Sequence, residues 1–465
     1  MNVMEHNHIK ADGVMSINPA NGVLLDFHPY QSDAAVEATL AAAAGAFRRA
    51  RIRPVADRLA LLGRVADALA ACRIELAALI VAEMGKPVTE ALAEVDKCVD
   101  SCRHFAEAGA AYLKPDPLAV TPQRARVSYE PLGVILAIMP WNFPIWQFVR
   151  FFITAVTAGN AIILKHAENV QGCAATLVAL VDAAGGDGVL QNLLVPRDRI
   201  AAVIADDRIA GVTFTGSVGA GRSVAAAAGA AGKKSVLELG GSDPFIVLSD
   251  ADLDLAVDIA VKSRFANTGQ SCICAKRFIV EGPIYDAFVE AFCARTRALV
   301  MGDPMQTGTR IGALARADLR DGLARQLDRS LSEGAQMILA GGVTDGPGFF
   351  FSPVVLADVP AGSTAATEEI FGPVAAIFRA GDADDAITQA NLSRFGLAAS
   401  LWTKDIARAE TLVPRIEAGA VFVNDLVRSV AGAPFGGIKD SGYGRELGQL
   451  GTREFTNQKL VWING

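Results

Sequence analysis

Residues 133–164 read GVILAIMPWNFPIWQFVRFFITAVTAGNAIIL. This segment is the most informative part of the sequence for predicting the fold. The segment begins with the apolar run 133–139 and ends with a second apolar run, 161–164. A proline-braced turn and a stretch of helical length lie between the two runs. Parallel strands need such a long crossover, usually a helix, whereas antiparallel strands can be joined by a short turn. The segment therefore predicts a strand–helix–strand unit in a parallel sheet.

The same alternation continues toward the C-terminus. Short apolar runs at 192–195 and 210–214 extend the first set, with helix-like segments between them. A second set begins near residue 240, with runs at 244–248, 277–280, 374–379, 398–402 and 420–423. Repeated strand and helix patterns of this kind predict an α/β protein with two successive α/β units.

The N-terminal side of the chain is helical in character. Four segments are rich in Ala, Leu and Glu at helical spacing: 34–47, 56–73, 75–84 and 88–111. Residues 120–129 differ, because they alternate and carry Arg124, Arg126 and Ser128. An exposed, polar strand usually needs a partner strand, so we expect assembly of several copies through this region.

Composition excludes several classes of function. The chain has 465 residues, of which 51% are hydrophobic and 20% charged, with a formal charge of -7. This composition is globular, and the acidic balance predicts neither nucleic-acid nor membrane binding. The N-terminal sequence lacks a signal-peptide pattern, and seven irregularly spaced cysteines are typical of reduced thiols, so we expect a cytoplasmic protein. No His or third Cys accompanies Cys98 and Cys102 at ligand spacing, so no metal is expected.

Two residues have the chemistry of a reactive site. Cys272 follows a polar, glycine-containing turn in NTGQSCIC, which suits a nucleophile, although an isolated cysteine is more often a buried loop residue. Glu238 ends an apolar run just before two glycines. Burial would raise its pKa toward neutrality, which suits a general base, and pairing with a cation is the alternative.

Two turns that follow predicted strands complete the set. Asn142 lies between two prolines, where its amide suits an oxyanion and where turn capping is the simpler role. Gly216 and Ser217 follow a predicted strand and begin a helix, a position that can hold a pyrophosphate on backbone N–H groups. The spacing of these glycines is not that of the common dinucleotide-binding motif, and an ordinary strand-to-helix turn is the alternative.

These segments together resemble the aldehyde dehydrogenase superfamily nearly from end to end. The segments that carry the resemblance are PWNFP, FTGS, ELGG, GQSC, EEIFGP and PFGG, in the family's order over about 300 residues. The chain is most similar to the NAD(P)-dependent succinate-semialdehyde dehydrogenase branch, especially in LKHAEN, LELGGSDPFIV and NTGQSCICAKR. The resemblance implies a Rossmann-like cofactor domain from residues 1–112 and 131–239, and a catalytic domain from 240–440. It also implies an oligomerisation element from 113–130 and 450–465, and a homodimer or homotetramer.

The resemblance also implies a mechanism. Cys272 attacks the aldehyde as a thiolate, Asn142 and the Cys272 N–H hold the oxyanion, and Glu238 activates the water that hydrolyses the thioester. The family pattern assigns cofactor contacts to Trp141, Lys165, Glu168, Gly216, Ser217, Glu369 and Phe371. A carboxylate at Glu168 would accept hydrogen bonds from a ribose and repel a 2′-phosphate, so NAD is predicted to be preferred, with NADP also accepted. The alternative for Glu168 is a solvated carboxylate at a helix start.

Arg150 indicates the substrate, because it lies in the otherwise apolar WQFVRFF. It is either a surface side chain that snorkels or a buried clamp for a carboxylate. In the resembled branch an Arg at this position binds the substrate carboxylate, which predicts succinate semialdehyde. Some members of this branch carry a second Arg at the position that is Ala266 here. Other substrates therefore remain alternatives: glutarate semialdehyde, and hydroxy, aryl or aliphatic aldehydes.

Further residues have weaker assignments. Gln147, Ser271 and Ile273 are expected in the same pocket, and Arg428 and Ser429 could add a carboxylate contact. Cys274 is either a redox partner of Cys272 or a spare small apolar residue; a bridge across one residue would be strained. A non-catalytic use of the fold predicts loss of a catalytic residue, whereas Cys272, Glu238 and Asn142 are all present.

Overall fold

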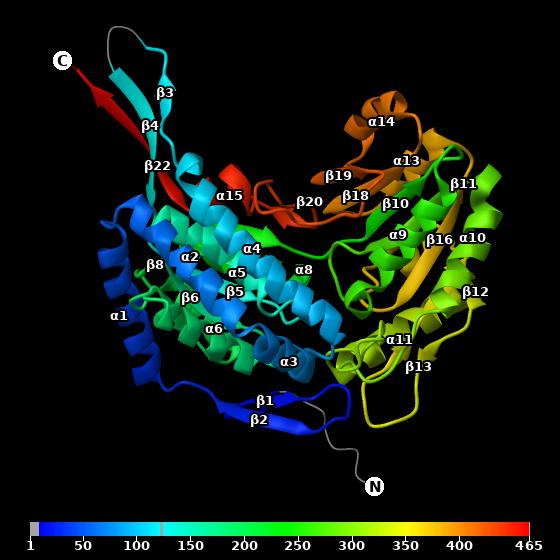
Figure 1. The fold of residues 1–465 in the computed structure, drawn as a ribbon, viewed down its shortest axis with the longest axis horizontal. Coiled ribbons are helices and arrows are strands. Elements are labelled where there is room, and N and C mark those ends of the chain that lie inside the picture. The colour runs from blue at the N-terminus through cyan, green and yellow to red at the C-terminus, as the bar shows by residue number, and fades with distance from the viewer. Residues whose placement is uncertain (1–8, 121–123, 465) are drawn as a thin grey trace.

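The computed structural model describes residues 9–120 and 124–464. Figure 1 shows two α/β lobes and a narrow β arm that projects from the N-terminal lobe. Residues 1–8 and 465 of the predicted domains, and residues 121–123 of the predicted strand 120–129, lie outside the described residues. No helix among the described residues is long and apolar enough to cross a membrane.

The N-terminal lobe contains a six-stranded sheet in the order β21-β9-β8-β5-β6-β7. The strands are β5 (Val134–Met139), β6 (Ala161–His166), β7 (Leu190–Asn192), β8 (Ile209–Thr215), β9 (Lys234–Glu238) and β21 (Gly442–Tyr443). Only β21 runs antiparallel to its neighbour. The five parallel strands have the order of a Rossmann-like sheet, with the switch point between β5 and β8. The predicted parallel sheet is confirmed.

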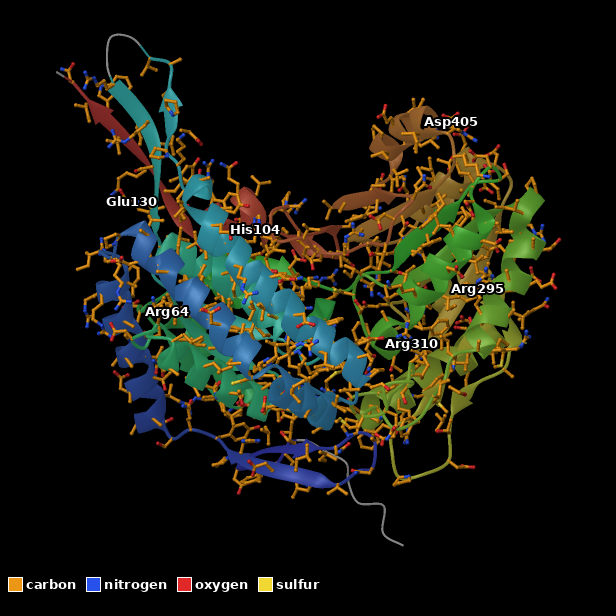
Figure 2. The ribbon with its side chains drawn as sticks, in the orientation of Figure 1. Arg64, His104, Glu130, Arg295, Arg310 and Asp405 are labelled. Atoms are coloured by element: carbon orange, nitrogen blue, oxygen red, sulfur yellow. The ribbon has the colours of Figure 1, made fainter. Side chains whose placement is uncertain are left out.

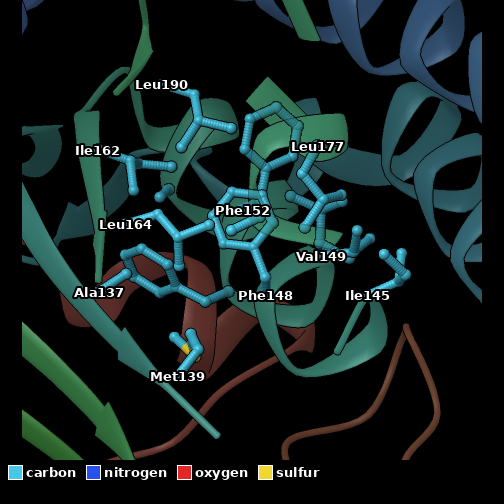
Figure 3. Packing of buried hydrophobic residues seen from close by; sticks show 14 of the residues in the cluster. Ala137, Met139, Ile145, Phe148, Val149, Phe152, Ile162, Leu164, Leu177 and Leu190 are labelled. Atoms are coloured by element: carbon cyan, nitrogen blue, oxygen red, sulfur yellow. The ribbon is translucent and has the colours of Figure 1, made fainter. Parts of the chain in front are cut away.

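Helices cover this sheet and supply its core. They are α1 (Asp33–Ala50), α2 (Val55–Ala71), α3 (Arg73–Met84), α4 (Val88–Tyr112), α5 (Trp146–Ala158), α6 (Gln171–Ala183), α7 (Ile200–Ala205) and α8 (Val218–Ala230). Helix α5 is apolar on nearly every side and is buried along its whole length, as expected for such a helix. Figure 3 shows Phe148 and Phe152 of α5 packed beside Leu164 of β6, and the two rings lie 5.4 Å apart.

The second lobe contains a seven-stranded sheet in the order β12-β15-β16-β11-β10-β18-β19. The strands are β10 (Asp243–Val247), β11 (Ala275–Glu281), β12 (Gln336–Leu339), β15 (Val354–Ala357), β16 (Val374–Ala380), β18 (Ala398–Trp402) and β19 (Ala420–Val423). All neighbours are parallel except β12 and β15. Its helices are α9 (Leu253–Phe265), α10 (Gly282–Arg297), α11 (Ala317–Ser332), α12 (Thr364–Thr367), α13 (Ala383–Asn391) and α14 (Ile406–Leu412). This second α/β unit agrees with the sequence patterns.

The arm in Figure 1 is a three-stranded antiparallel sheet in the order β22-β4-β3. Its strands are β3 (Asp116–Leu118), β4 (Arg124–Pro131) and β22 (Thr456–Ile463). Strand β22 pairs with β4 over eight residues, from Thr456 opposite Pro131 to Ile463 opposite Arg124. Glu130, labelled in Figure 2, forms an ion pair with Lys459 across this pairing. The predicted strand therefore has a partner within its own chain.

The structure corrects several predicted boundaries. Residues 13–29 form a hairpin, β1 (Gly13–Ile17) and β2 (Leu24–Pro29), which the helical pattern of the N-terminal region did not indicate. The predicted run 192–195 begins two residues late and ends three residues late, because β7 is Leu190–Asn192. Residues 450–454 of the expected oligomerisation element belong to helix α15 (Gly448–Glu454). The sequence shows no clear periodicity of apolar residues at the remaining short strands. These are β13 (Gly342–Val343), β14 (Phe351–Ser352), β17 (Phe395–Gly396) and β20 (Ile438–Lys439).

Candidate functional site

The segment before Cys272 has a backbone conformation that most side chains avoid. Asn267, Thr268 and Gly269 have successive φ values of 53°, 55° and 75°. Left-handed φ is unfavourable for a β-branched residue such as Thr268. A Cβ on Gly269 would also lie 2.5 Å from the carbonyl carbon of Gly372, so this position requires glycine. Such strain is stored only where surrounding contacts fix the chain.

Side-chain hydrogen bonds supply those contacts. Thr268 Oγ1 accepts from the Gly312 N–H at 2.9 Å, which ties the segment to the second lobe. Asn267 Nδ2 donates to the Asn142 carbonyl at 2.7 Å, which ties it to the turn after β5. The polar residues of NTGQSC therefore hold the position of the thiol, and the strain is concentrated beside it.

Cys272 lines a cavity of about 580 Å³ between the two lobes. Among the residues that line it are Gln147, Arg150, Ser271, Ile273 and Ser429, so five of the six expected pocket residues are brought together with the thiol, and Arg428 is not. Burial raises the pKa of Cys272 to about 12, while Arg150 and then Lys276 oppose that rise. Thiolate formation here depends on nearby positive charge.

Asn142 lies beside the thiol segment. Its Nδ2 donates to the Gln270 carbonyl at 3.1 Å, and its Oδ1 is buried without a partner among the described residues. On one side Trp141 lines a second cleft, and on the other Phe143 lines the cavity of Cys272. The PWNFP turn therefore forms part of both walls, and a second N–H of the Asn142 amide is available to a ligand.

Glu238 is the last residue of β9 and is almost completely buried. Neither carboxylate oxygen has a hydrogen-bond partner in the described part of the chain. Burial raises the pKa of Glu238 well above its ordinary value; Arg150 opposes this rise and Glu446 adds to it. A Cβ on Gly436 would lie 2.7 Å from Glu238 Oε1, so the PFGG segment leaves room for this carboxylate. Two roles were considered for Glu238, a general base and the partner of a cation. Among the described residues Glu238 forms no salt bridge, so the second role is not supported.

Arg150 is buried, with 2% of its surface exposed, so the snorkelling alternative is wrong. Its Nε forms an ion pair with Glu446, and its guanidinium lies 4.6 Å from the centre of the Phe435 ring. Arg150 thus holds a carboxylate of its own chain and still lines the cavity of Cys272. Because the whole group is removed from water, loss of either partner leaves a buried unpaired charge.

Lys97 of α4 is a second cation in the same cavity, and the sequence patterns did not assign it a role. Its Nζ donates to Ser429 Oγ at 2.8 Å and lies 4.3 Å from the centre of the Trp146 ring. Burial, and then repulsion by Arg150, lowers the pKa of Lys97 to about 8. Arg428 points elsewhere and pairs with Asp425 at 2.7 Å, so only Ser429 of that loop reaches the cavity.

The second cleft, of about 660 Å³, lies at the switch point between β5 and β8. In Rossmann-like sheets ligands bind at this point, beyond the carboxyl ends of the strands. Five of the expected cofactor residues line it: Trp141, Lys165, Glu168, Gly216 and Ser217. Ser217 is the N-cap of α8 and makes no capping bond with its side chain, so the free N–H groups of the helix start are available to a phosphate. The cleft therefore fits a dinucleotide.

Glu168 is buried in this cleft, so the alternative of a solvated helix-start carboxylate is wrong. Its Oε1 accepts from Lys165 Nζ at 2.9 Å and from Arg197 Nε at 3.0 Å. Burial acts to raise the pKa of Glu168, but Lys165 and Arg197 outweigh it and hold the pKa well below its ordinary value. The cleft thus presents a charged carboxylate between two cations.

Glu369 and Phe371 do not line either cavity. Glu369 Oε1 accepts from the Gly241 N–H at 3.0 Å and faces Lys276 Nζ at 3.4 Å. The Phe371 ring packs edge-to-face on Trp141, with 5.8 Å between ring centres. Both residues therefore lie next to the PWNFP turn and the thiol segment.

Cys274 is buried and points away from the cavity. Its Sγ donates to the Ser271 carbonyl at 2.9 Å and accepts from Arg264 Nη1 at 2.8 Å. Arg264 also donates to the carbonyls of Ile370 and Gly372, so it joins the EEIFGP segment to the thiol segment. Cys272 and Cys274 are both free thiols, and a disulfide between them stays a prediction.

The sequence patterns missed several charged residues of the site, among them Lys97, Arg264, Lys276 and Glu446. All four are buried or line the cavity. A charged residue inside an otherwise buried strand or helix is uncommon unless it is paired, and that was the available signal for Lys276 within β11 and Arg264 within α9. Glu446 had no comparable signal, because its place in the site depends on pairing with Phe435 and on contacts with elements far away in the sequence.

Comparisons with known proteins agree with this geometry. The aldehyde dehydrogenase family model matches residues 7–461. The chain is 48% identical over 453 residues to succinate semialdehyde dehydrogenase [NAD(P)+] Sad of Escherichia coli, covering 97% of this chain and 98% of that protein. It is 46% identical over 455 residues to succinate-semialdehyde dehydrogenase [NADP(+)] of Mycolicibacterium paratuberculosis, covering 97% and 96% of the two chains.

A solved structure is similar throughout. The succinic semialdehyde dehydrogenase of Streptococcus pyogenes, in complex with NADP+, superimposes with a TM-score of 0.95 at 36% identity. That match covers 97% of this chain and all of the other. The family match spans nearly the whole chain, both curated relatives exceed 45% identity over nearly their full lengths, and the chain therefore belongs to the aldehyde dehydrogenase family.

Proposed function

We propose that this protein oxidises succinate semialdehyde to succinate with NAD(P). The observation that carries the proposal is a single cavity lined by a thiol, Cys272, and by cations that include Arg150, which is buried, and Lys97. A thiol suits covalent addition to an aldehyde, and cations suit a carboxylate at the other end of the substrate. The names of the two curated relatives given above state succinate semialdehyde as their substrate.

In the proposed mechanism Cys272 adds as a thiolate to the aldehyde carbon. The Asn142 amide and the Cys272 N–H stabilise the oxyanion of the thiohemiacetal. Lys165, Glu168 and Ser217 would hold a nicotinamide cofactor in the second cleft, and this cofactor would accept the hydride that leaves the thiohemiacetal carbon. The carbon that loses the hydride becomes the carbonyl of a thioester on Cys272. Glu238 takes a proton from water, the hydroxide adds to the thioester, and the acid departs as the thiolate returns.

We propose that NAD is preferred over NADP because Glu168 is the charged carboxylate expected at the adenine ribose. A 2′-phosphate there would meet a like charge, although Lys165 and Arg197 offset part of it. Replacing Glu168→Ser removes the carboxylate and is expected to narrow the ratio of kcat/KM for NAD over NADP. An unchanged ratio would show that Glu168 does not select the cofactor.

We further propose that the protein works in the cytoplasm as a homodimer or homotetramer. All seven cysteines are free, which suits a reducing compartment. The β arm exposes apolar side chains, including Leu460 and Trp462, as a surface for a second copy. The domain boundaries given above stay predictions, while the six-, seven- and three-stranded sheets support three structural parts.

The test of substrate class is a set of initial rates with NAD and with NADP. Succinate semialdehyde and butanal have the same number of carbons but differ in the carboxylate, and glutarate semialdehyde adds one methylene. A kcat/KM at least tenfold higher for succinate semialdehyde than for butanal is the expected result. Equal values would remove the carboxylate from recognition, and a faster rate with glutarate semialdehyde would change the chain length assigned.

A further inference from the structure

Lys276 is a fully buried cation directly behind the thiol segment. It is the second residue of β11, four residues after Cys272. Its Nζ donates to the Ser271 carbonyl at 2.9 Å and to the Cys272 carbonyl at 2.8 Å, and it faces Glu369 Oε1 at 3.4 Å. An ammonium has three N–H groups; two of them donate to these carbonyls, and the charge of the group also faces Glu369.

These contacts fix the orientation of the peptide that precedes the thiol. The peptide between Ser271 and Cys272 is planar and trans, so its carbonyl and its N–H point in opposite directions. Because Lys276 holds the Ser271 carbonyl, the Cys272 N–H must point away from Lys276. A charged donor on the carbonyl also polarises the peptide and strengthens the N–H as a hydrogen-bond donor.

The same ammonium also acts on the thiol through its charge. Burial raises the pKa of Cys272; Arg150 and Lys276 lower it, and Glu369 and Asp243 raise it. Arg150, which is ion-paired with Glu446, lowers the pKa of Cys272 more than Lys276 does. Lys276 belongs to the same chain segment as Cys272, and it is bonded to that segment.

We propose that Lys276 is a positioning residue, which aims the Cys272 N–H as an oxyanion donor and supplies fixed positive charge for the thiolate. The proposal rests on Cys272 being the nucleophile of the proposed function. It explains why a cation is buried in β11 at the cost of desolvation, when an apolar residue would fill the same space.

The test is the pH dependence of Cys272 alkylation by iodoacetamide, followed by mass spectrometry of the peptide that contains Cys272. Lys276→Met retains the shape of the side chain and removes the charge. The apparent pKa of alkylation is expected to rise by at least one unit, so that the rate at pH 8 falls about tenfold or more. With butanal, kcat should fall by a similar factor, while KM changes little. Lys276→Arg should restore most of the alkylation rate.

Arg277→Met is the matched control. Arg277 is also a buried cation of β11, and it donates to the carbonyls of Ser242, Gln389 and Ala390, away from the thiol. Both substitutions are expected to lower Tm, but only Lys276→Met should move the alkylation profile. If the two variants shift the profile equally, the role of Lys276 is structural and the proposal is wrong.

Two further experiments complete the test. If Lys276→Met does not fold, Lys276→Gln retains a neutral donor for one carbonyl and is expected to show the same rise in alkylation pKa. If alkylation of Cys272 in the unsubstituted protein leaves activity intact, the proposed function fails. An unchanged profile in the neutral Lys276 variants, with Cys272 still essential, overturns only the role of Lys276.

Discussion

Glu238 and Cys272 are both titratable groups whose burial opposes the charged form. Burial raises the pKa of Glu238 well above its ordinary value, and it raises the pKa of Cys272 to about 12. Burial therefore disfavours the charged form of both groups in the free protein. Arg150 lies close enough to lower both pKa values, so the charge state of one group depends on the other.

Replacing Glu238→Gln should separate the two halves of the reaction. The thiol can still form the acyl-enzyme, but no carboxylate is left to activate water. A rapid burst of reduced cofactor is expected, followed by a steady-state rate at least a hundredfold lower, as general base catalysis contributes about 10²–10⁴-fold. Stopped-flow absorbance measures both phases. A steady-state rate equal to that of the unsubstituted protein would exclude Glu238 as the base.

Lys97 predicts a pH dependence for substrate binding. Its pKa is lowered to about 8 by burial and then by Arg150, so its charge is present below that pH and is lost above it. Cys98, Glu94 and Arg428 also contribute to its field. KM for succinate semialdehyde is therefore expected to rise as the pH passes from 7 to 9, while KM for butanal stays nearly constant.

Two substitutions check this assignment. Lys97→Arg keeps its charge at high pH and should flatten the rise in KM. Lys97→Met should raise KM for succinate semialdehyde about tenfold to a hundredfold at pH 7, because a charged hydrogen bond contributes about 1.5–3 kcal/mol. If butanal shows the same changes as the semialdehyde, Lys97 acts on the shape of the cavity and does not bind a carboxylate.

At the scale of secondary-structure elements, the strain before Cys272 makes a prediction about Gly269. This residue has φ of 75°, and a Cβ there would lie 2.5 Å from the carbonyl carbon of Gly372. Gly269→Ala should lower the free energy of unfolding by about 1–3 kcal/mol and reduce kcat, because the clash displaces the EEIFGP segment. Chemical denaturation and initial rates measure the two effects.

Gly219→Ala is the control for Gly269→Ala. Gly219 lies in α8, and nothing lies within 4 Å of the position that its Cβ would take. Alanine is a better helix former than glycine, so this substitution is expected to leave stability unchanged or slightly improved. If Gly269→Ala behaves like Gly219→Ala, the segment before Cys272 is not strained.

Most strands of the two large sheets could be predicted because they are continuous apolar runs, and many of these, such as β18, are buried on both faces. Strands β18 and β19 begin and end at the predicted residues. The β1–β2 hairpin could not be predicted, because β2 exposes most of its residues and shows no alternation to recognise. Within the site, residues in recognisable motifs were found, whereas Lys97 and Glu446 reach it only through tertiary contacts between distant segments.

At the scale of the whole molecule, the two lobes meet along the PWNFP turn and the thiol segment. Trp141 belongs to the dinucleotide-shaped cleft and Phe143 to the cavity of Cys272, with Asn142 between them. Arg310, labelled in Figure 2, lines the Cys272 cavity from the second lobe, and Glu90 lines it from α4. Neither lobe alone contains a complete site, because Glu238 ends strand β9 of the first sheet and Cys272 lies in the loop before strand β11 of the second.

The arm predicts how whole molecules assemble. Leu460 and Trp462 of β22 are 57% and 50% exposed, and Ile463 beside them is 46% exposed. Apolar side chains on a projecting sheet are stabilised when a second copy covers them. The double substitution Leu460→Glu and Trp462→Glu should therefore shift the mass measured by light scattering from dimer or tetramer toward monomer.

Ile52→Glu is the matched control for the arm. Ile52 is 80% exposed and lies in the connection between α1 and α2, outside the strands of the β arm. This variant should keep the mass of the unsubstituted protein. The arm residues lie outside both cavities, so the monomeric variant is expected to retain the binding of cofactor measured by calorimetry. An unchanged mass in the double variant would show that the arm is not the assembly surface, because two buried glutamates at an apolar interface would cost several kcal/mol.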